Sequence, residues 1–411
     1  MRGGPRTRPA AANPRTVLFV HSSSGHYGAD RQLQLIATGL DPSRYRPIVV
    51  LPEALGRGDP APLASDPAPL ADELRAAGIE ILTRPLAVLR RGLLNPRGLA
   101  ALLAFTGRDG AALAALIRRR DVALVHSNTS VVLGGAAAAA LARVPHVWHV
   151  REIYSGFARA WPAYCRLLSS AAALPCVSRA TAAQFPPASQ RVSVTYDGLA
   201  LDAGRAPRAT ARATLGLDPD APVIAVLGRI SDWKGQDVLV RALAEPPLRD
   251  RGAIGLIAGE AWPGAEHRQA WVLDLAVRLG VSDRLALVGF REDVETIYGA
   301  ADLVAVPSTA PDPLPGAAIE AAAAGCAVLA SDHGGLPEII HDAVTGRLLA
   351  PGDATDLARV AGELLADPAQ RERLGSAAAL DVRERFSPAR LLSAVQQLYD
   401  TCVARREHRG P

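Results

Sequence analysis

The stretch Val223-Ile-Ala-Val-Leu-Gly-Arg-Ile-Ser-Asp-Trp-Lys-Gly235 begins as an unbroken apolar run and ends in a short loop with two glycines and two cations. The apolar run is typical of a strand buried on both faces, and the loop after it predicts the start of a helix. A loop that leads from a strand into a helix exposes backbone N–H groups, which suit a phosphate. The stretch therefore predicts a βα unit with a phosphate site.

Lys234 is the only lysine in this chain of 411 residues, although lysine and arginine together number 45. An ammonium is a compact charge with rotating donors, whereas a guanidinium is a wide planar fork, so a retained lysine indicates a position that arginine does not suit. Arg229 lies on the same loop, and two such cations can hold a diphosphate. The alternative is a lysine that survives by chance on a solvated loop.

Strand-like apolar runs alternate with helical patterns along the whole chain, which favours parallel sheets with crossover helices. The length, with 49% hydrophobic and 21% charged residues, indicates two globular domains. We predict an α/β fold of two doubly wound, Rossmann-like domains that face each other across a crevice. The predicted strands are Thr16–His21, Pro47–Leu51, Ile79–Leu82, Ala123–His126, His146–Val150, Leu174–Val177, Val223–Leu227, Ile254–Ala258, Leu285–Val288, Leu303–Val306, Val328–Ala330 and Gly346–Leu349.

The domain limits follow from shifts in composition. Residues 1–14 are basic and rich in proline, with no apolar core of a signal peptide, and are predicted to be a disordered lead-in. The first domain is predicted over 15–199 and the second over 200–385, with a hinge rich in alanine, arginine and proline between them. A C-terminal helix within 386–411 is expected to cross back to the first domain.

The charge and cysteine content bear on partners and location. A net charge of +4 without lysine-rich runs does not favour a nucleic-acid partner. The four cysteines are far apart in the sequence and lack metal-ligand spacing, which favours a reducing compartment. No apolar run is long enough to span a bilayer. We therefore expect a cytoplasmic protein.

Arginines concentrate between Arg84 and Arg120, a stretch that also carries several large apolar residues. Such a pattern can form a basic, amphipathic surface that rests on anionic lipid at the inner face of a membrane. The alternative is a set of ordinary helices with solvated arginines. The apolar residues concerned are Leu93, Leu94, Leu102, Leu103 and Phe105.

A second chemical motif, Asp312-Pro-Leu-Pro-Gly316-Ala317-Ala-Ile-Glu320, follows the predicted strand Leu303–Val306. The Pro-Gly pair and the alanine-rich run after it predict a helix start. The first turn of that helix exposes the N–H groups of Gly316 and Ala317, which suit an anion. The carboxylates of Asp312 and Glu320 can accept hydrogen bonds from sugar hydroxyls, although each could equally be a plain turn or helix residue.

Several polar residues end strands of the first domain and are candidates for a substrate site. His149 ends one strand and His126 another, with Asn128 and Arg151 close by in the sequence. We predict His149 as a catalytic residue together with Arg229, Lys234 and Asp312, and His126, Asn128 and Arg151 as acceptor-binding residues. No grouping of histidine and acid has convincing metal-ligand spacing, so no metal site is predicted.

The motifs together resemble those of the family 4 (group 1) retaining glycosyltransferases of GT-B fold, over about residues 15 to 400. The resemblance implies a retaining transfer of a sugar from a UDP- or GDP-linked donor to a hydroxyl acceptor, without a metal or other cofactor. A nucleotide-sugar epimerase and an inactive binding module are the alternatives. The segments that carry the resemblance are His26-Tyr-Gly28-Ala-Asp30-Arg-Gln-Leu33, Gly228-Arg229 with Lys234-Gly235, Leu287-Val-Gly-Phe290 with Ala301-Asp302-Leu303, and Ser308 to Glu338, which includes Glu320-Ala-Ala-Ala-Ala-Gly325 and His333-Gly-Gly-Leu-Pro-Glu338.

The resemblance also implies roles for single residues. Asp312 would hold the hydroxyls of the donor sugar, although the family has the longer glutamate there, and this difference leaves the sugar open. The acceptor, which is a sugar, a lipid-linked intermediate or a small metabolite, is open as well. The remaining implied roles are diphosphate binding by Arg229 and Lys234, ribose binding by Glu320, phosphate contacts from the backbone of Gly316 and Ala317, base contacts near Gly289 and Phe290, closure over the diphosphate by the loop of Gly28, and a place beside the donor sugar for His149.

Overall fold

The computed structural model describes residues 13–25, 28–53, 69–90, 93, 95–154, 160–187, 189–199, 204–262 and 264–409. Residues 1–12 of the predicted lead-in lie outside the described residues. Arg91 and Leu94 of the predicted basic surface lie outside them too.

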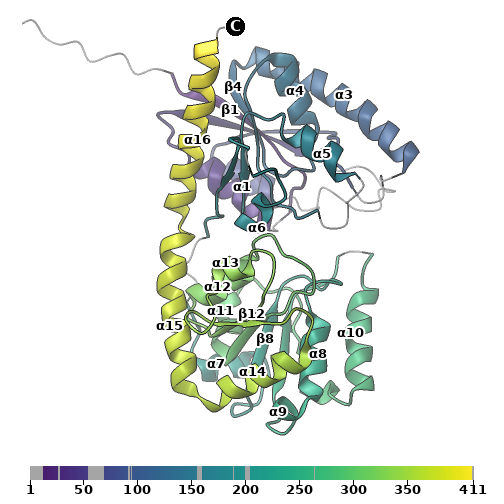
Figure 1. Ribbon diagram of the computed structural model, residues 1–411, viewed down its shortest axis with the longest axis vertical. Coiled ribbons are helices and arrows are strands. Elements are labelled where there is room, and N and C mark those ends of the chain that lie inside the picture. Colours follow the sequence, from purple (N-terminus) through teal and green to yellow (C-terminus); the bar gives the residue numbers. More distant parts are fainter. Residues whose placement is uncertain are drawn as a thin grey trace, which may run out of the picture. The chain divides into compact units, whose positions relative to one another are not determined.

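The chain forms two units, each with a parallel sheet of its own (Figure 1). The first unit takes in Met1–Val150, Ala163–Pro175 and Leu392–Pro411, and the second Arg151–Pro162 and Cys176–Leu391. The two Rossmann-like α/β folds confirm the predicted fold class. The crevice between the domains stays a prediction.

The contacts assign Cys176–Leu391 to the second unit, so the segment just before the predicted limit at residue 199 lies in that unit, where Glu338 holds it. Its carboxylate accepts hydrogen bonds from the backbone N–H groups of Arg179 and Ala180, both at 2.8 Å, and from the hydroxyl of Tyr196 at 2.9 Å. No local pattern predicts these contacts, since the partners are more than 140 positions apart.

The sheet of the first unit has five parallel strands in the order β3-β2-β1-β4-β5. Its apolar strand residues, such as Leu18 and Val125, are fully buried because helices cover both faces. The strands are β1 (Arg15–Val20), β2 (Tyr45–Pro52), β3 (Glu80–Arg84), β4 (Val122–Ser127) and β5 (His146–Trp148), and the helices are α1 (Gly28–Gly39), α2 (Pro69–Ala76), α3 (Pro96–Arg119), α4 (Gly134–Ala142), α5 (Trp161–Leu168) and the C-terminal α16 (Pro388–Arg409).

The sheet of the second unit has six parallel strands in the order β10-β9-β8-β11-β12-β13. Its strands are β8 (Val223–Leu227), β9 (Ile254–Ala258), β10 (Leu285–Leu287), β11 (Leu303–Val306), β12 (Val328–Ser331) and β13 (Arg347–Leu349). The helices are α6 (Arg179–Ala182), α7 (Arg208–Thr214), α8 (Gln236–Ala244), α9 (Pro246–Arg249), α10 (His267–Arg278), α11 (Val294–Ala300), α12 (Gly316–Ala323), α13 (Leu336–Ile339), α14 (Ala354–Ala366) and α15 (Pro368–Arg385), with a 3-10 turn η2 at Ser282–Arg284.

Every predicted strand is present, and its ends lie within two residues of the predicted ones. A further two-stranded sheet joins β6 (Leu174–Cys176) to β7 (Val192–Val194), and β7 was not predicted. The short run Val192-Ser-Val has too little alternation or apolar length to be recognised as a strand.

The strand orders place one switch point in each sheet. The chain moves outward in one direction from β1 and in the other from β4, and it does the same from β8 and β11. Ligands of doubly wound sheets bind outside the carboxyl ends of the strands at such a point. In the second unit, the loop with Arg229 and Lys234 follows β8 and the loop with Asp312 follows β11.

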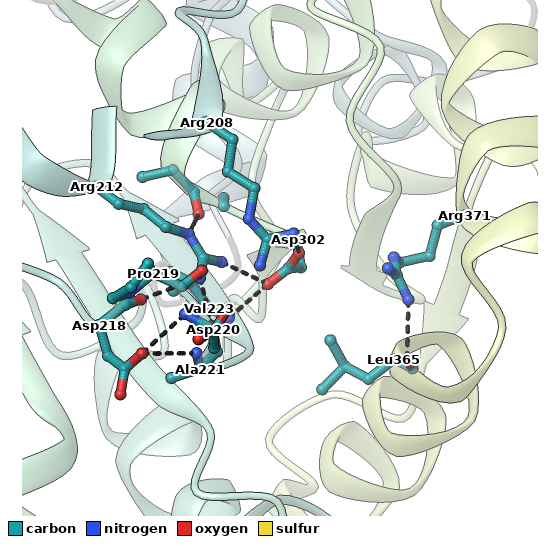
Figure 2. Close-up of polar contacts among 12 residues, drawn as sticks. Arg208, Arg212, Asp218, Pro219, Asp220, Ala221, Val223, Asp302, Leu365 and Arg371 are labelled. Carbon is teal, nitrogen blue, oxygen red and sulfur yellow. Dashed lines mark hydrogen bonds and ion pairs between the residues drawn. The ribbon is translucent and has the colours of Figure 1, made fainter. Parts of the chain in front are cut away.

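A buried ion pair fixes the amino ends of β8 and β11 (Figure 2). The Arg212 guanidinium lies 2.8 Å from Asp302 Oδ2, and only 1% of the arginine side chain is exposed. The same carboxylate oxygen accepts the backbone N–H of Val223, the first residue of β8, at 2.8 Å. Arg212 also donates to the carbonyls of Pro219 and Ala221. Strands β8 and β11 therefore start from one hydrogen-bonded cluster.

Helix α3 is the one helix of the described part of the chain that is long and apolar enough to cross a membrane. Residues along its length, such as Leu102, Leu113 and Ile117, are buried in the first unit, where α3 packs against α4. The side chains of Leu99, Leu103 and Phe105 near its N-terminal end are 44%, 71% and 49% exposed.

Asp302→Asn should lower the free energy of unfolding by about 3 kcal/mol, because it leaves the buried Arg212 charge without its counter-charge. Chemical denaturation of both proteins measures the difference. Asp250→Asn is the control, since Asp250 pairs with Arg249 where both side chains are more than half exposed, and it should change stability by less than about 1 kcal/mol. Equal effects of the two substitutions would contradict the importance of the buried pair.

Candidate functional site

The loop after β8 packs directly on the first residue after β11. Gly235 caps the start of α8 with a φ of 77°, a conformation that favours glycine. A Cβ at this position would lie 1.9 Å from the carbonyl oxygen of Pro307. The close approach of the two loops therefore depends on glycine, which explains the Lys-Gly pair in the sequence.

Lys234 and Asp312, predicted separately as donor-site residues, form an ion pair. Lys234 Nζ lies 2.6 Å from Asp312 Oδ2, with 21% and 6% of the two side chains exposed. A largely buried pair of this kind is screened less by salt than a surface pair. The structure thus brings the predicted phosphate-binding cation and the predicted sugar-binding carboxylate into direct contact.

Two consecutive glycines fix the backbone around Asp312. The N–H of Gly335 donates to the Asp312 carbonyl at 2.7 Å, and a Cβ on Gly334 would lie 2.4 Å from that oxygen. A Cβ on Gly335 would lie 2.1 Å from the carbonyl oxygen of Pro313. The His-Gly-Gly segment after β12 is therefore a support on which the Asp312 loop rests.

The other predicted cation, Arg229, is held from two directions. Its backbone carbonyl accepts a hydrogen bond at 3.1 Å from the side-chain amide of Gln236, the first residue of α8. Its guanidinium lies over the indole ring of Trp262, 4.6 Å from the ring centroid. Arg229 and Lys234 therefore both belong to one hydrogen-bonded loop.

Helix α12 begins at Gly316, as the Pro-Gly pair predicts. Pro315 stands at the cap position, and no side chain caps this end of the helix. No capping side chain therefore accepts a hydrogen bond from the first-turn N–H groups of Gly316 and Ala317. Glu320 lies one turn further on and accepts a hydrogen bond from the Tyr298 hydroxyl at 3.3 Å. Its predicted contact with ribose stays a prediction.

The predicted base-binding segment follows β10. The Gly289 carbonyl accepts the N–H of Gly259 at 2.7 Å, and the N–H of Phe290 donates to the Glu260 carboxylate at 3.3 Å. The side chain of Phe290 is 56% exposed. The segment is therefore joined by its backbone to the loop after β9, and its predicted contact with a base stays a prediction.

In the first unit, a buried polar cluster occupies the β1–β4 switch point. His21 Nε2 lies 2.7 Å from Asp30 Oδ1, and the Asn128 amide nitrogen lies 3.3 Å from His21 Nδ1. Asn128 also donates to the carbonyl of Ala29, next to Gly28. The cluster fixes the start of α1. A Cβ on Gly28 would meet nothing within 4 Å in the structure, and the predicted closure of its loop over a diphosphate stays a prediction.

The predicted substrate histidines of the first unit are fully buried. The rings of His126 and His149 stack with centroids 5.5 Å apart, and His126 Nδ1 is hydrogen-bonded to the hydroxyl of Tyr399 on α16. Burial raises the pKa of Tyr399 well above its usual value, so the phenol stays protonated. His126 therefore anchors the C-terminal helix. The predicted roles of His126, Asn128 and His149 toward a substrate stay predictions.

Arg151, predicted to bind the acceptor from the first domain, belongs to the second unit. Its guanidinium lies 2.5 Å from the carboxylate of Asp197, with 7% and 15% of the two side chains exposed. Burial raises the pKa of Asp197, while the arginine opposes this shift. Its predicted contact with an acceptor stays a prediction.

Three site residues were not predicted: Gln236, Trp233 and Trp262. Gln236 is buried, and its side-chain amide donates to the backbone carbonyl of Arg229. The two tryptophans lie against the two cations. The rarity of tryptophan, with five in the chain, and the position of Trp233 beside the only lysine were the available signals.

The two parallel, Rossmann-like sheets place the chain in the GT-B class of fold, which solved structures share. Two family models match the chain: "Glycosyltransferase Family 4" over residues 26–202 and "Glycosyl transferases group 1" over residues 207–381. Together these matches take in most of the chain. It belongs to the glycosyltransferases of family 4, group 1.

Several curated relatives share the name D-inositol 3-phosphate glycosyltransferase. The D-inositol 3-phosphate glycosyltransferase of Nocardia farcinica is 41% identical over 173 residues, which are 41% of this chain and 38% of the relative. The protein of that name from Streptomyces bingchenggensis is 36% identical over 220 residues, 51% of this chain and 47% of the relative. The matched part therefore spans less than half the length of these relatives.

Solved structures share the fold over nearly the whole chain. Anabaena HepE in complex with UDP-glucose has a TM-score of 0.75 at 25% identity, covering 95% of this chain and 99% of that chain. A glycosyltransferase from Rickettsia africae has a TM-score of 0.76 at 19% identity, with the same coverage. Sucrose-phosphate synthase from Thermosynechococcus elongatus has a TM-score of 0.72 at 22% identity, again with the same coverage.

Gly235→Ala should separate the two sheet-edge loops and destabilise the second unit. The new Cβ would meet the Pro307 carbonyl, so we expect a loss of about 2 kcal/mol beyond the cost of the backbone conformation itself. Gly280→Ala is a matched control, because Gly280 has a φ of 67° and open space around its Cβ position. Thermal and chemical unfolding compare the two variants, and similar losses would show that the loop contact contributes little.

Proposed function

We propose that this protein is a retaining glycosyltransferase that transfers a sugar from a UDP- or GDP-linked donor to a hydroxyl group. The observation that carries the proposal is the set of positive groups at the β8–β11 switch point. Arg229 and Lys234 share the loop after β8, and the uncapped N-terminus of α12 follows β11. These groups suit a diphosphate. The names of the family and of its relatives support the same class of reaction.

The chemical step is the departure of the nucleoside diphosphate from the anomeric carbon. Negative charge grows on the leaving phosphate oxygen as the bond breaks, and preorganised positive groups stabilise that charge. In the proposal, Arg229 and Lys234 supply them, with the backbone N–H groups of Gly316 and Ala317. Asp312 then accepts hydrogen bonds from the donor sugar, while Lys234 bridges the carboxylate and the phosphate.

The stereochemistry is proposed as retention. The acceptor hydroxyl attacks the anomeric carbon from the face that the diphosphate leaves, and its proton passes to the leaving phosphate oxygen. His149 is proposed to lie beside the donor sugar, and Glu320 to bind the ribose. No step requires a metal, because the cations and the helix terminus balance the charge. Activity should therefore persist in EDTA.

The acceptor is proposed to be a polyhydroxyl compound bound with the help of His126, Asn128 and Arg151. A sugar, a lipid-linked intermediate and a small metabolite all fit this description. The shared name of the curated relatives makes an inositol phosphate the first acceptor to test. UDP-glucose is the first donor to test, because HepE was solved with it.

We also propose a cytoplasmic location with peripheral contact to anionic membrane. All four cysteines are buried and form no disulfide. Free thiols of this kind are typical of proteins in a reducing compartment. The only acid of helix α3, Asp109, is buried, whereas Arg97, Arg108, Arg118 and Arg119 are exposed. Together with its exposed Leu99, Leu103 and Phe105, the helix offers a basic and apolar surface to lipid.

Lys234→Ala should lower turnover more than ten-fold, by removing a charge that meets the leaving diphosphate. A thermal-shift screen against UDP, GDP, ADP, TDP and their sugar conjugates first identifies the donor series, because a ligand of the folded state raises the melting temperature. The rate of transfer from that donor is then measured in EDTA. Arg249→Ala, which removes an exposed cation of the same unit, is the control.

Three outcomes would contradict this proposal. Near-normal turnover of Lys234→Ala would exclude the predicted role of the lysine, and strict dependence on Mg²⁺ would exclude metal-independence. Isomerised donor without transfer would instead indicate an epimerase. Tight binding with neither transfer nor hydrolysis would indicate an inactive binding module.

The membrane proposal predicts that the protein co-sediments with phosphatidylglycerol vesicles and not with phosphatidylcholine vesicles. Leu103→Ser combined with Phe105→Ser should weaken this binding by about ten-fold or more, because apolar area no longer enters the lipid. Leu380→Ser is the control, since Leu380 is 76% exposed on α15 of the other unit. Equal vesicle binding by the Leu103/Phe105 double variant and the Leu380→Ser control would show that α3 is not the contact surface.

A further inference from the structure

Two of the five tryptophans in the chain lie against the two cations of the candidate donor site. The guanidinium carbon of Arg229 is 4.6 Å from the ring centroid of Trp262, and Lys234 Nζ is 4.4 Å from that of Trp233. The face of an indole ring carries partial negative charge and attracts a cation within about 6 Å. Each cation therefore has an aromatic surface of its own.

The backbone brings Trp262 to Arg229 by pairing the loops after β8 and β9. The N–H of Gly228 donates to the Ala258 carbonyl and that of Ile230 to the Glu260 carbonyl, both at 2.9 Å. A Cβ on Gly259 would lie 2.1 Å from the Gly228 carbonyl, so the loops approach closely only because this residue is glycine. The ring of Trp262 follows three residues later and lies beside the cation.

Trp233 is fixed to a different loop. Its carbonyl accepts the N–H of Thr309, after β11, at 2.8 Å. The neighbouring Lys234 is thus held between the ring of Trp233 and the carboxylate of Asp312. Both cations lie on loops that are fixed by backbone hydrogen bonds, and both keep part of their surface open to an anion.

We propose that Trp262 and Trp233 are positioning residues for the donor diphosphate, and this inference rests on the proposed function. A free arginine or lysine side chain loses rotamer freedom when it binds a phosphate. The rings restrict both side chains before the donor arrives, so less freedom is lost on binding. The effect acts on the diphosphate and not on the nucleoside.

The test compares Trp262→Leu, Trp262→Phe and Trp271→Leu by calorimetry with the nucleoside diphosphate that stabilises the wild-type protein. Trp271 is a matched control, because it is 44% exposed on α10 of the same unit and Trp262 is 39% exposed. Trp262→Leu should weaken binding about three- to ten-fold. Trp262→Phe should retain most of the affinity, since the ring face remains, and Trp271→Leu should leave it unchanged. Trp233→Leu should act like Trp262→Leu.

A double-substitution cycle identifies the cation through which Trp262 acts. In an Arg229→Gln background, Trp262→Leu should cause no further loss of affinity. An equal loss in both backgrounds, or an equal loss for the nucleoside without phosphates, would overturn the inference, because the ring would then act on the base. Trp262→Leu binding as tightly as the wild type would overturn it as well. A wild-type protein that binds no nucleoside diphosphate would instead remove the proposed function and this inference together.

Discussion

The pairing of β8 with β11 is the constraint on which the candidate site depends. Ile224 and Leu303 are partners in this pairing, although almost 80 residues separate them in the sequence. At the amino ends, the buried Arg212–Asp302 pair joins both strands through Val223. At the carboxyl ends, Gly235 lets the loop after β8 pack on Pro307. The cations and the carboxylate meet because their strands are neighbours.

The sequence was sufficient for the features that depend on local pattern. Unbroken apolar runs predicted the strands of both sheets, and the Pro-Gly pair predicted the first residue of α12. The single lysine pointed to the loop after β8, because composition made it stand out, and its binding of phosphate stays a prediction. Features that depend on distant partners were not predictable. The hydrogen bond from Arg179 to Glu338, the ion pair of Arg151 with Asp197 and the contact of Trp262 with Arg229 each join segments that are distant in the sequence.

Asp312 stands where the family has the longer glutamate, and in this chain it contacts Lys234 directly. Its 2.6 Å ion pair holds the lysine in place before a donor arrives. In the proposed function, a diphosphate would meet a cation that is already oriented, and less side-chain freedom would be lost on binding. In the inference above, Trp233 and Trp262 likewise hold Lys234 and Arg229 in place before a donor binds. Preorganised charge is the common property of the candidate donor site.

The affinity of the stabilising nucleoside diphosphate, compared with that of its nucleoside, tests this preorganised charge most directly. Titration calorimetry on the intact protein in EDTA measures both. Charge-assisted hydrogen bonds to two cations predict that the diphosphate binds about a hundred-fold more tightly than the nucleoside. Equal affinities would show that the loop of Arg229 and Lys234 does not bind phosphate, and would contradict the assignment of the β8–β11 switch point as the donor site.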